Sequence, residues 1–280
     1  MIYNTPMRFL LIIFSLLFFP AFANECIVRG VSDDAPVLCG HATQGGFLYG
    51  ESDWRVKAAA GNLTYKDGVF VVGIPMDAPK ILTLKFCAGG LLNRCRAFDY
   101  KITQRKYREQ HVNVDRKFIE YPPQIQTRID AEREKIRAAR DIVDTSFLEF
   151  LDFRYPFDKK WPMTSVYGSR RVFNGVPMSP HNGIDIAAPR GTPIRSIGRG
   201  VVTLTLDSYL NGKTVVIAHG FGIFSVYIHL DRIDARAGDA VTHESIIGTV
   251  GATGRVSGPH LHLGLYHKNT ALDPALLFQS

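Results

Sequence analysis

The sequence predicts a mainly β protein with two domains that a helical connector joins. Short alternating or apolar runs rich in β-branched residues fill residues 43–102 and most of residues 161–280. Between them, a segment with helical spacing follows Pro122. With 280 residues, 46% of them hydrophobic, the chain is long enough for two cores. We therefore expect a signal peptide at 1–23, a small antiparallel β domain at 24–103, a helical connector at 104–160, and an antiparallel β domain at 161–280.

The first 23 residues have the pattern of a secretory signal. Arg8 precedes the apolar run from Phe9 to Phe19, and Ala21-Phe22-Ala23 forms a small-residue cleavage site before Asn24. The run is about eleven residues long, whereas a membrane-spanning helix needs roughly 20. We therefore expect an exported mature chain that begins at Asn24 and has no integral membrane span.

The net charge is modestly positive. It is +7 for the whole chain, and removal of Arg8 with the signal leaves +6. No phosphate-binding loop or RNA-binding motif accompanies the charge, so we predict no nucleic-acid partner. A small positive excess instead suits an anionic surface such as a cell-wall polymer.

All four cysteines, Cys26, Cys39, Cys87 and Cys95, lie in the N-terminal domain. In an oxidising compartment an even set of cysteines in a small domain indicates two disulfides, although three pairings are possible. Proximity in sequence favours Cys26 with Cys39 and Cys87 with Cys95. A zinc ribbon is disfavoured because no Cys-x-x-Cys spacing occurs.

The connector contains one amphipathic segment from Pro122 to about Thr145. Ile125, Ile129, Ile136 and Val143 fall on one face of a helix, and charged residues fill the others. The stripe predicts packing against one of the two domains, and the charges predict a solvated outer face.

Two motifs in the C-terminal domain carry metal-binding chemistry. His260 and His262 are two apart in an apolar run, so both point to one face of a strand while Leu261 and Leu263 point into the core. His181 and Asp185 form a second half-site, but four strand residues span roughly 13 Å. A bend at Asn182-Gly183 would bring them together.

Two histidines and one carboxylate that leave one position open are typical of catalytic zinc, whereas structural zinc usually has four ligands, often thiolates. The alternative for the His-x-His pair alone is two partly buried, hydrogen-bonded histidines. His219, His243 and His267 are expected to have no role in the site, and the last two are expected in surface turns.

The C-terminal domain resembles the lysostaphin-like, LytM-type zinc metallopeptidases that cut peptidoglycan, in the exported Gram-negative form with an N-terminal β domain. The resemblance covers about residues 161–280. It rests on these segments: Tyr167-Gly168-Ser169-Arg170, His181 with Asp185, Gly191-Thr192-Pro193, His219-Gly220, Tyr227-Ile228-His229-Leu230, Gly238-Asp239, Gly248, Gly251-Ala252-Thr253-Gly254, Gly258-Pro259-His260-Leu261-His262 and Asp273-Pro274.

The resemblance implies one Zn²⁺ per chain, held by His181, Asp185 and His262, and a water activated by the paired catalytic histidines His229 and His260. It further implies a periplasmic, wall-associated endopeptidase that hydrolyses peptidoglycan cross-links, with D-alanyl-diaminopimelate bonds favoured over glycyl bridges. No Glu base is indicated, because the His-Glu-x-x-His motif is absent. Departures from the family pattern are a longer polar loop at 171–178 and the linker at 255–256.

Two other functions fit the same fold. One is a catalytically silent, wall-binding activator of an amidase, but such proteins lack zinc ligands that are all present here. The other is a carbohydrate- or peptide-binding module that uses the face of the sheet. A regulatory protein partner remains possible in any of these cases and is not identified by the sequence.

Overall fold

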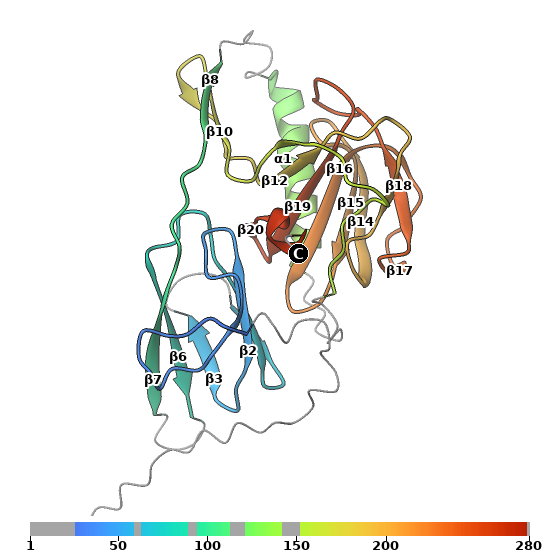
Figure 1. The fold of residues 1–280 in the computed structure, drawn as a ribbon. Helices are drawn as coiled ribbons and strands as arrows, with labels where there is room; N and C mark the ends of the chain where they lie inside the picture. The colour runs from blue at the N-terminus through green and yellow to red at the C-terminus, as the bar shows by residue number, and fades with distance from the viewer. Residues whose placement is uncertain (1–25, 59–62, 89–93, 113–120, 142–151, 279–280) are drawn as a thin grey trace, which may run out of the picture.

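The computed structural model describes residues 26–58, 63–88, 94–112, 121–141 and 152–278. The predicted signal peptide and Val143 lie outside the described residues. Within these ranges the protein is mainly β with a single α-helix, which confirms the predicted fold class. A smaller N-terminal β body lies below a larger C-terminal sheet in Figure 1, and the helix lies beside that sheet.

The N-terminal β body consists of two antiparallel sheets with strand orders β1-β2-β5-β4 and β3-β6-β7. Alternation along β6 puts Leu82, Leu84 and Phe86 in the core and leaves Ile81 and Lys85 exposed. The strands are β1 (Cys39–Gly40), β2 (Phe47–Glu51), β3 (Arg55–Ala58), β4 (Leu63–Lys66), β5 (Val69–Gly73), β6 (Ile81–Cys87) and β7 (Cys95–Lys101).

Both disulfides that sequence proximity favours are present. One joins Cys26 to Cys39, and the other joins Cys87 to Cys95. Cys87 and Cys95 face each other directly across β6 and β7, so their bond closes the end of that strand pair. The N-terminal body therefore has covalent cross-links in addition to its hydrophobic core.

The C-terminal sheet has the order β17-β14-β15-β16-β19-β12-β9, with β13, β18 and β20 pairing at its sides. Its central strand β16 is buried along most of its length because neighbours cover both edges and both faces. The strands of this sheet are β9 (Met163–Ser165), β12 (Gly183–Ile186), β13 (Pro193–Arg195), β14 (Gly200–Ser208), β15 (Gly212–Ala218), β16 (Ile223–Ile233), β17 (Ala240–Val241), β18 (Ile246–Val250), β19 (Leu261–His267) and β20 (Thr270–Leu272). β10 (Arg170–Phe173) and β11 (Val176–Pro177) belong to a separate small sheet, and a 3-10 helix spans Pro274–Phe278.

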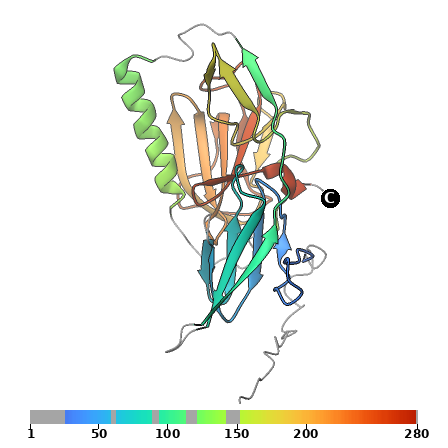
Figure 2. The same ribbon diagram turned by 90° about the vertical axis from the view of Figure 1, so that its left-hand side faces the viewer.

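Helix α1 (Pro123–Ala139) packs against one face of the C-terminal sheet, as its apolar stripe predicts (Figure 2). Ile136 and Ala139 join a cluster with Val216 and Phe224 of the sheet. The helix ends at Ala139, earlier than the predicted end near Thr145. It carries too many charges to cross a membrane, and no helix among the described ranges has the length and hydropathy of a bilayer span.

The connecting segment also contributes a strand, β8 (Glu109–Val112), which the sequence did not indicate. β8 pairs in parallel with β10, and β10 pairs with β11, so the connector reaches the hairpin that precedes His181. We propose that boundaries near residues 103 and 160 still separate the two domains, with β8 as an arm of the connector.

The two domains pack directly against each other. The prediction that His267 lies in a surface turn is wrong, because its ring is fully buried at this interface. Its Nδ1 accepts a hydrogen bond from the Gly73 amide, and its Nε2 lies 3.0 Å from the Thr64 hydroxyl. Arg105 of the connector also forms an ion pair of 2.7 Å with Asp273.

We expect the buried ring of His219 to make the folded chain less stable in acid. Burial lowers its pKa from 6.5 to about 4, against the hydrogen bond to the Arg199 carbonyl, which raises it. As the pH falls from about 6.5 to about 4, His219 binds a proton in the unfolded chain but stays neutral in the folded chain. The free energy of unfolding therefore falls by on the order of 3 kcal/mol. Denaturant unfolding at pH 7 and pH 4.5 should show a smaller loss for His219→Gln than for the native chain.

The matched control is His243→Gln, a change on a partly exposed ring beside Glu244. It should leave the acid loss at the native size. An equal loss in the native chain and His219→Gln would show that His219 does not cause it.

Candidate metal centre

The pairing of β12 with β19 positions two of the predicted ligands. Asp185 lies directly opposite His262 in this antiparallel pair, so both side chains point to the same face. Their neighbours Ile184, Leu261 and Leu263 are fully buried on the other face. The alternation seen in the sequence thus places a carboxylate and an imidazole side by side above the core.

His181 reaches these two side chains because it precedes the strand. β12 begins at Gly183, and His181 lies in the turn before it, where its amide donates to the Ser169 carbonyl. A Cβ at Gly183 would lie 2.3 Å from the Leu263 carbonyl oxygen and 2.8 Å from His262 Nε2. Only glycine fits this close approach of β12 to β19, which brings the start of β12 and the preceding His181 next to His262.

The three donor atoms converge on one point. His181 Nε2 is 2.8 Å from His262 Nδ1 and 3.1 Å from Asp185 Oδ1, and His262 Nδ1 is 2.9 Å from the same oxygen. These are the residues that could hold a metal ion among those the structure describes. Ligands about 2.0–2.1 Å from a tetrahedral Zn²⁺ are separated by roughly 3.3 Å, so small side-chain shifts would accommodate the ion.

The outer contacts of the three side chains fix which atoms face the centre. His181 Nδ1 is 3.1 Å from the Val166 carbonyl oxygen, so it donates there and leaves Nε2 as an acceptor. Burial raises the pKa of Asp185, but the adjacent His181 and His262 side chains outweigh burial and hold that pKa well below its usual range. Burial also lowers the pKa of His262. A carboxylate and two imidazoles form a donor set that suits Zn²⁺.

His229 and His260 lie beside this cluster. Their ring centroids are 4.9 Å apart, and His260 Nε2 is 3.8 Å from Asp185 Oδ1. Each ring has its Nδ1 within 2.9 Å of a backbone carbonyl oxygen, that of Thr253 for His229 and that of Gly258 for His260. Because Nδ1 donates, Nε2 of each ring keeps its lone pair.

The backbone at His229 is strained. Its φ is 66°, a left-handed value inside β16, at a point where the pairing with β15 shifts register. The His229 amide donates to the Asn211 carbonyl, which helps to hold the distorted strand. Burial lowers the pKa of His229 to about 4, against the raising effect of the Thr253 hydrogen bond, so the ring is neutral near pH 7.

All five predicted site residues therefore come together on one face of the sheet. The sequence did not indicate the carbonyl acceptors of Val166, Thr253 and Gly258, since backbone groups carry no residue signature. His219, by contrast, is buried away from the cluster, where its Nε2 lies 2.7 Å from the Ser225 hydroxyl.

An antiparallel sheet that holds two histidines and an aspartate within one ion's reach, with two further histidines beside them, defines a metallopeptidase type of domain. The family can be stated as well. Residues 179–274 match the model of Peptidase family M23, so this part of the chain is an M23 peptidase domain of the LytM type. The matched range includes all five site residues.

Similar proteins agree with this assignment. The chain is 43% identical over 113 residues to peptidoglycan DD-endopeptidase ShyA of Vibrio cholerae. The aligned region covers 40% of this chain and 26% of ShyA. It is 44% identical over 82 residues to DD-carboxypeptidase/endopeptidase Mpg of Neisseria meningitidis, covering 29% of this chain and 19% of Mpg. The chain thus spans about a quarter or less of the length of these relatives.

A solved structure resembles much more of the chain. A peptidase M23 protein of Pseudomonas aeruginosa superposes with a TM-score of 0.62 at 29% identity, covering 84% of this chain and 94% of that one. The likeness therefore extends beyond the peptidase domain.

Proposed function

We propose that the protein is an exported, zinc-dependent endopeptidase that hydrolyses peptide cross-links of peptidoglycan in the periplasm. The observation that carries the proposal is the convergence of His181 Nε2, Asp185 Oδ1 and His262 Nδ1 within 3.1 Å, beside His229 and His260. The two disulfides and the predicted signal peptide support export. The names of ShyA and Mpg support peptidoglycan as the substrate.

Each side chain has a task in this proposal. His181, Asp185 and His262 would hold the metal, which when bound supplies a Lewis acid that polarises the scissile carbonyl and acidifies a water molecule. His229 and His260 would take the proton from that water at Nε2 and later donate one to the leaving amine. Their backbone hydrogen bonds at Nδ1 fix the tautomer and aim both rings, so little reorganisation is needed.

We expect the cut bond to be the D-alanyl-diaminopimelate cross-link, in keeping with the DD-endopeptidase names of the relatives. Purified cross-linked peptidoglycan dimers incubated with the zinc-loaded protein should yield monomers, identified by mass. Pentaglycine is the comparison substrate and should stay intact. Dimers that stay intact while pentaglycine is cut would show specificity for glycyl bridges instead.

The silent activator is the competing function. It predicts that the protein cuts neither substrate and instead raises the activity of an added amidase. The presence of every ligand and of both catalytic histidines argues against it, because a protein that only binds has no need of this donor set.

A further inference from the structure

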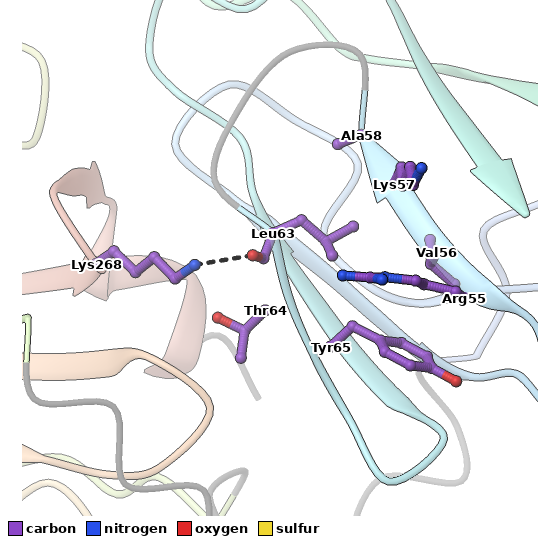
Figure 3. A pocket seen from close by; sticks show the side chains of 8 residues that line it. All are labelled: Arg55, Val56, Lys57, Ala58, Leu63, Thr64, Tyr65 and Lys268. Atoms are coloured by element: carbon purple, nitrogen blue, oxygen red, sulfur yellow. Dashed lines mark hydrogen bonds between the residues drawn. The ribbon is translucent and has the colours of Figure 1, made fainter.

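A cleft of about 600 Å³ opens where the N-terminal domain meets the turn after β19 (Figure 3). β3 and β4 line its two sides, and each is the edge strand of its own sheet. Lys268 from the C-terminal domain reaches into it and donates to the Leu63 carbonyl. Both domains therefore contribute to the cleft.

The charged side chains that line the cleft are all positive. Arg55, Lys57 and Lys268 line it, and none of the described residues that line it is acidic. Among the residues that the structure describes, neither Arg55 nor Lys57 forms an ion pair. Figure 3 shows Arg55 extending from β3 toward Leu63, above the ring of Tyr65. A cleft lined by cations and by no carboxylate among the described residues has a positive potential, which favours an anionic ligand.

The cleft is also held in shape. His267, next to Lys268, is fixed by its contacts with Gly73 and Thr64 across the domain interface. The Lys268 amide donates to the Gly222 carbonyl, and the backbone there has a φ of 53°. A ligand that enters would meet an already positioned Lys268, which lowers the cost of binding at that side of the cleft.

We propose that this cleft binds an acidic, extended peptide, namely the carboxylate-bearing stem peptides of peptidoglycan. The two edge strands offer backbone groups along which an extended peptide can lie, the cations match its carboxylates, and Tyr65 and Leu63 supply apolar contact. The identity of the polymer rests on the proposed function.

The cleft and the metal centre must hold different parts of the polymer. His262 and Lys268 are six residues apart along β19 and the turn after it, a path of roughly 20 Å. Stem peptides bound in the cleft would therefore keep the enzyme on the wall, while a different peptide occupies the metal centre and is cleaved. This predicts that the cleft matters for the polymer and not for small soluble substrates.

The test compares Arg55→Gln/Lys57→Gln and, separately, Lys268→Met with the control Lys80→Gln/Lys101→Gln, which removes two exposed charges outside the cleft. All are made in a His260→Ala background, so that insoluble peptidoglycan stays undigested during sedimentation. The cleft variants should bind on the order of tenfold more weakly and the control like the background. Amidation of the peptidoglycan carboxylates should weaken binding of the background protein to the same extent.

Cleft variants that sediment like the control would overturn the proposal, and so would binding that amidation does not change. Thermal unfolding of each variant shows whether it is folded. In the His260-containing protein, the same substitutions should leave turnover of a soluble dimer unchanged. If the native chain fails to cut that dimer while binding still depends on the cleft, the proposed hydrolysis fails and the cleft assignment stands.

Discussion

His262→Ala is expected to lose both zinc and activity. The substitution removes one of three protein ligands, and His181 with Asp185 cannot hold the ion at comparable affinity. The variant should purify with far less than one zinc per chain, and hydrolysis of cross-linked dimers should fall to background. Metal analysis by mass spectrometry beside a turnover assay measures both quantities.

His243→Ala is the matched control, since it removes an imidazole that lies by Glu244 and not at the centre. It should keep zinc and activity. A His262→Ala protein that holds zinc as tightly as the control would remove His262 from the ligand set.

His260→Ala is expected to keep zinc near one per chain and to lose on the order of 10² to 10⁴ in turnover, the usual effect of a missing acid-base group. The reason is geometric. His260 Nε2 lies 3.8 Å from Asp185 Oδ1, beside the three donor atoms and outside their contacts of 2.8–3.1 Å.

His229→Ala should behave in the same way, because its Nε2 also keeps a lone pair beside the ligands. Because the backbone of residue 229 is strained, with a φ of 66°, folding of this variant should also be checked. A His260→Ala or His229→Ala protein that is folded but free of zinc would make that histidine a ligand.

The strand that carries the site could be predicted from its sequence. Period-2 alternation in Leu261-His262-Leu263 correctly places the leucines in the core and His262 on the opposite face. The bend expected at Asn182-Gly183 stays a prediction, and the close approach of Gly183 to β19 is a tertiary contact that no local pattern contains.

The same alternation, continued to the end of the strand, would have put His267 on the buried face with Leu261, Leu263 and Leu265. The prediction of a surface turn did not continue that alternation to His267. The structure reverses it because the N-terminal domain supplies Gly73 and Thr64 as partners for both ring nitrogens. A buried polar residue whose partners come from another domain cannot be identified by composition.

Features that depend on contacts between distant segments could not be predicted from the sequence. β8 forms only because β10 lies alongside it, and its four residues carry no strong strand pattern of their own. The carbonyl groups that orient His181, His229 and His260 likewise depend on where distant loops pass. The sequence thus predicts which side chains form the site, whereas the fold determines how they are aimed.

We propose that one zinc ion, held by His181, Asp185 and His262, makes this chain a peptidoglycan hydrolase. The most direct measurement is digestion of purified cross-linked peptidoglycan dimers by the zinc-loaded protein, by the protein after removal of metal with a chelator, and by the same sample after zinc is restored. The zinc-loaded protein should cleave the dimers, and the protein without metal should not. Restored zinc should bring cleavage back at one zinc per chain. Cleavage that persists without metal, or a protein that binds one zinc per chain and cuts no cross-linked peptide, would contradict it.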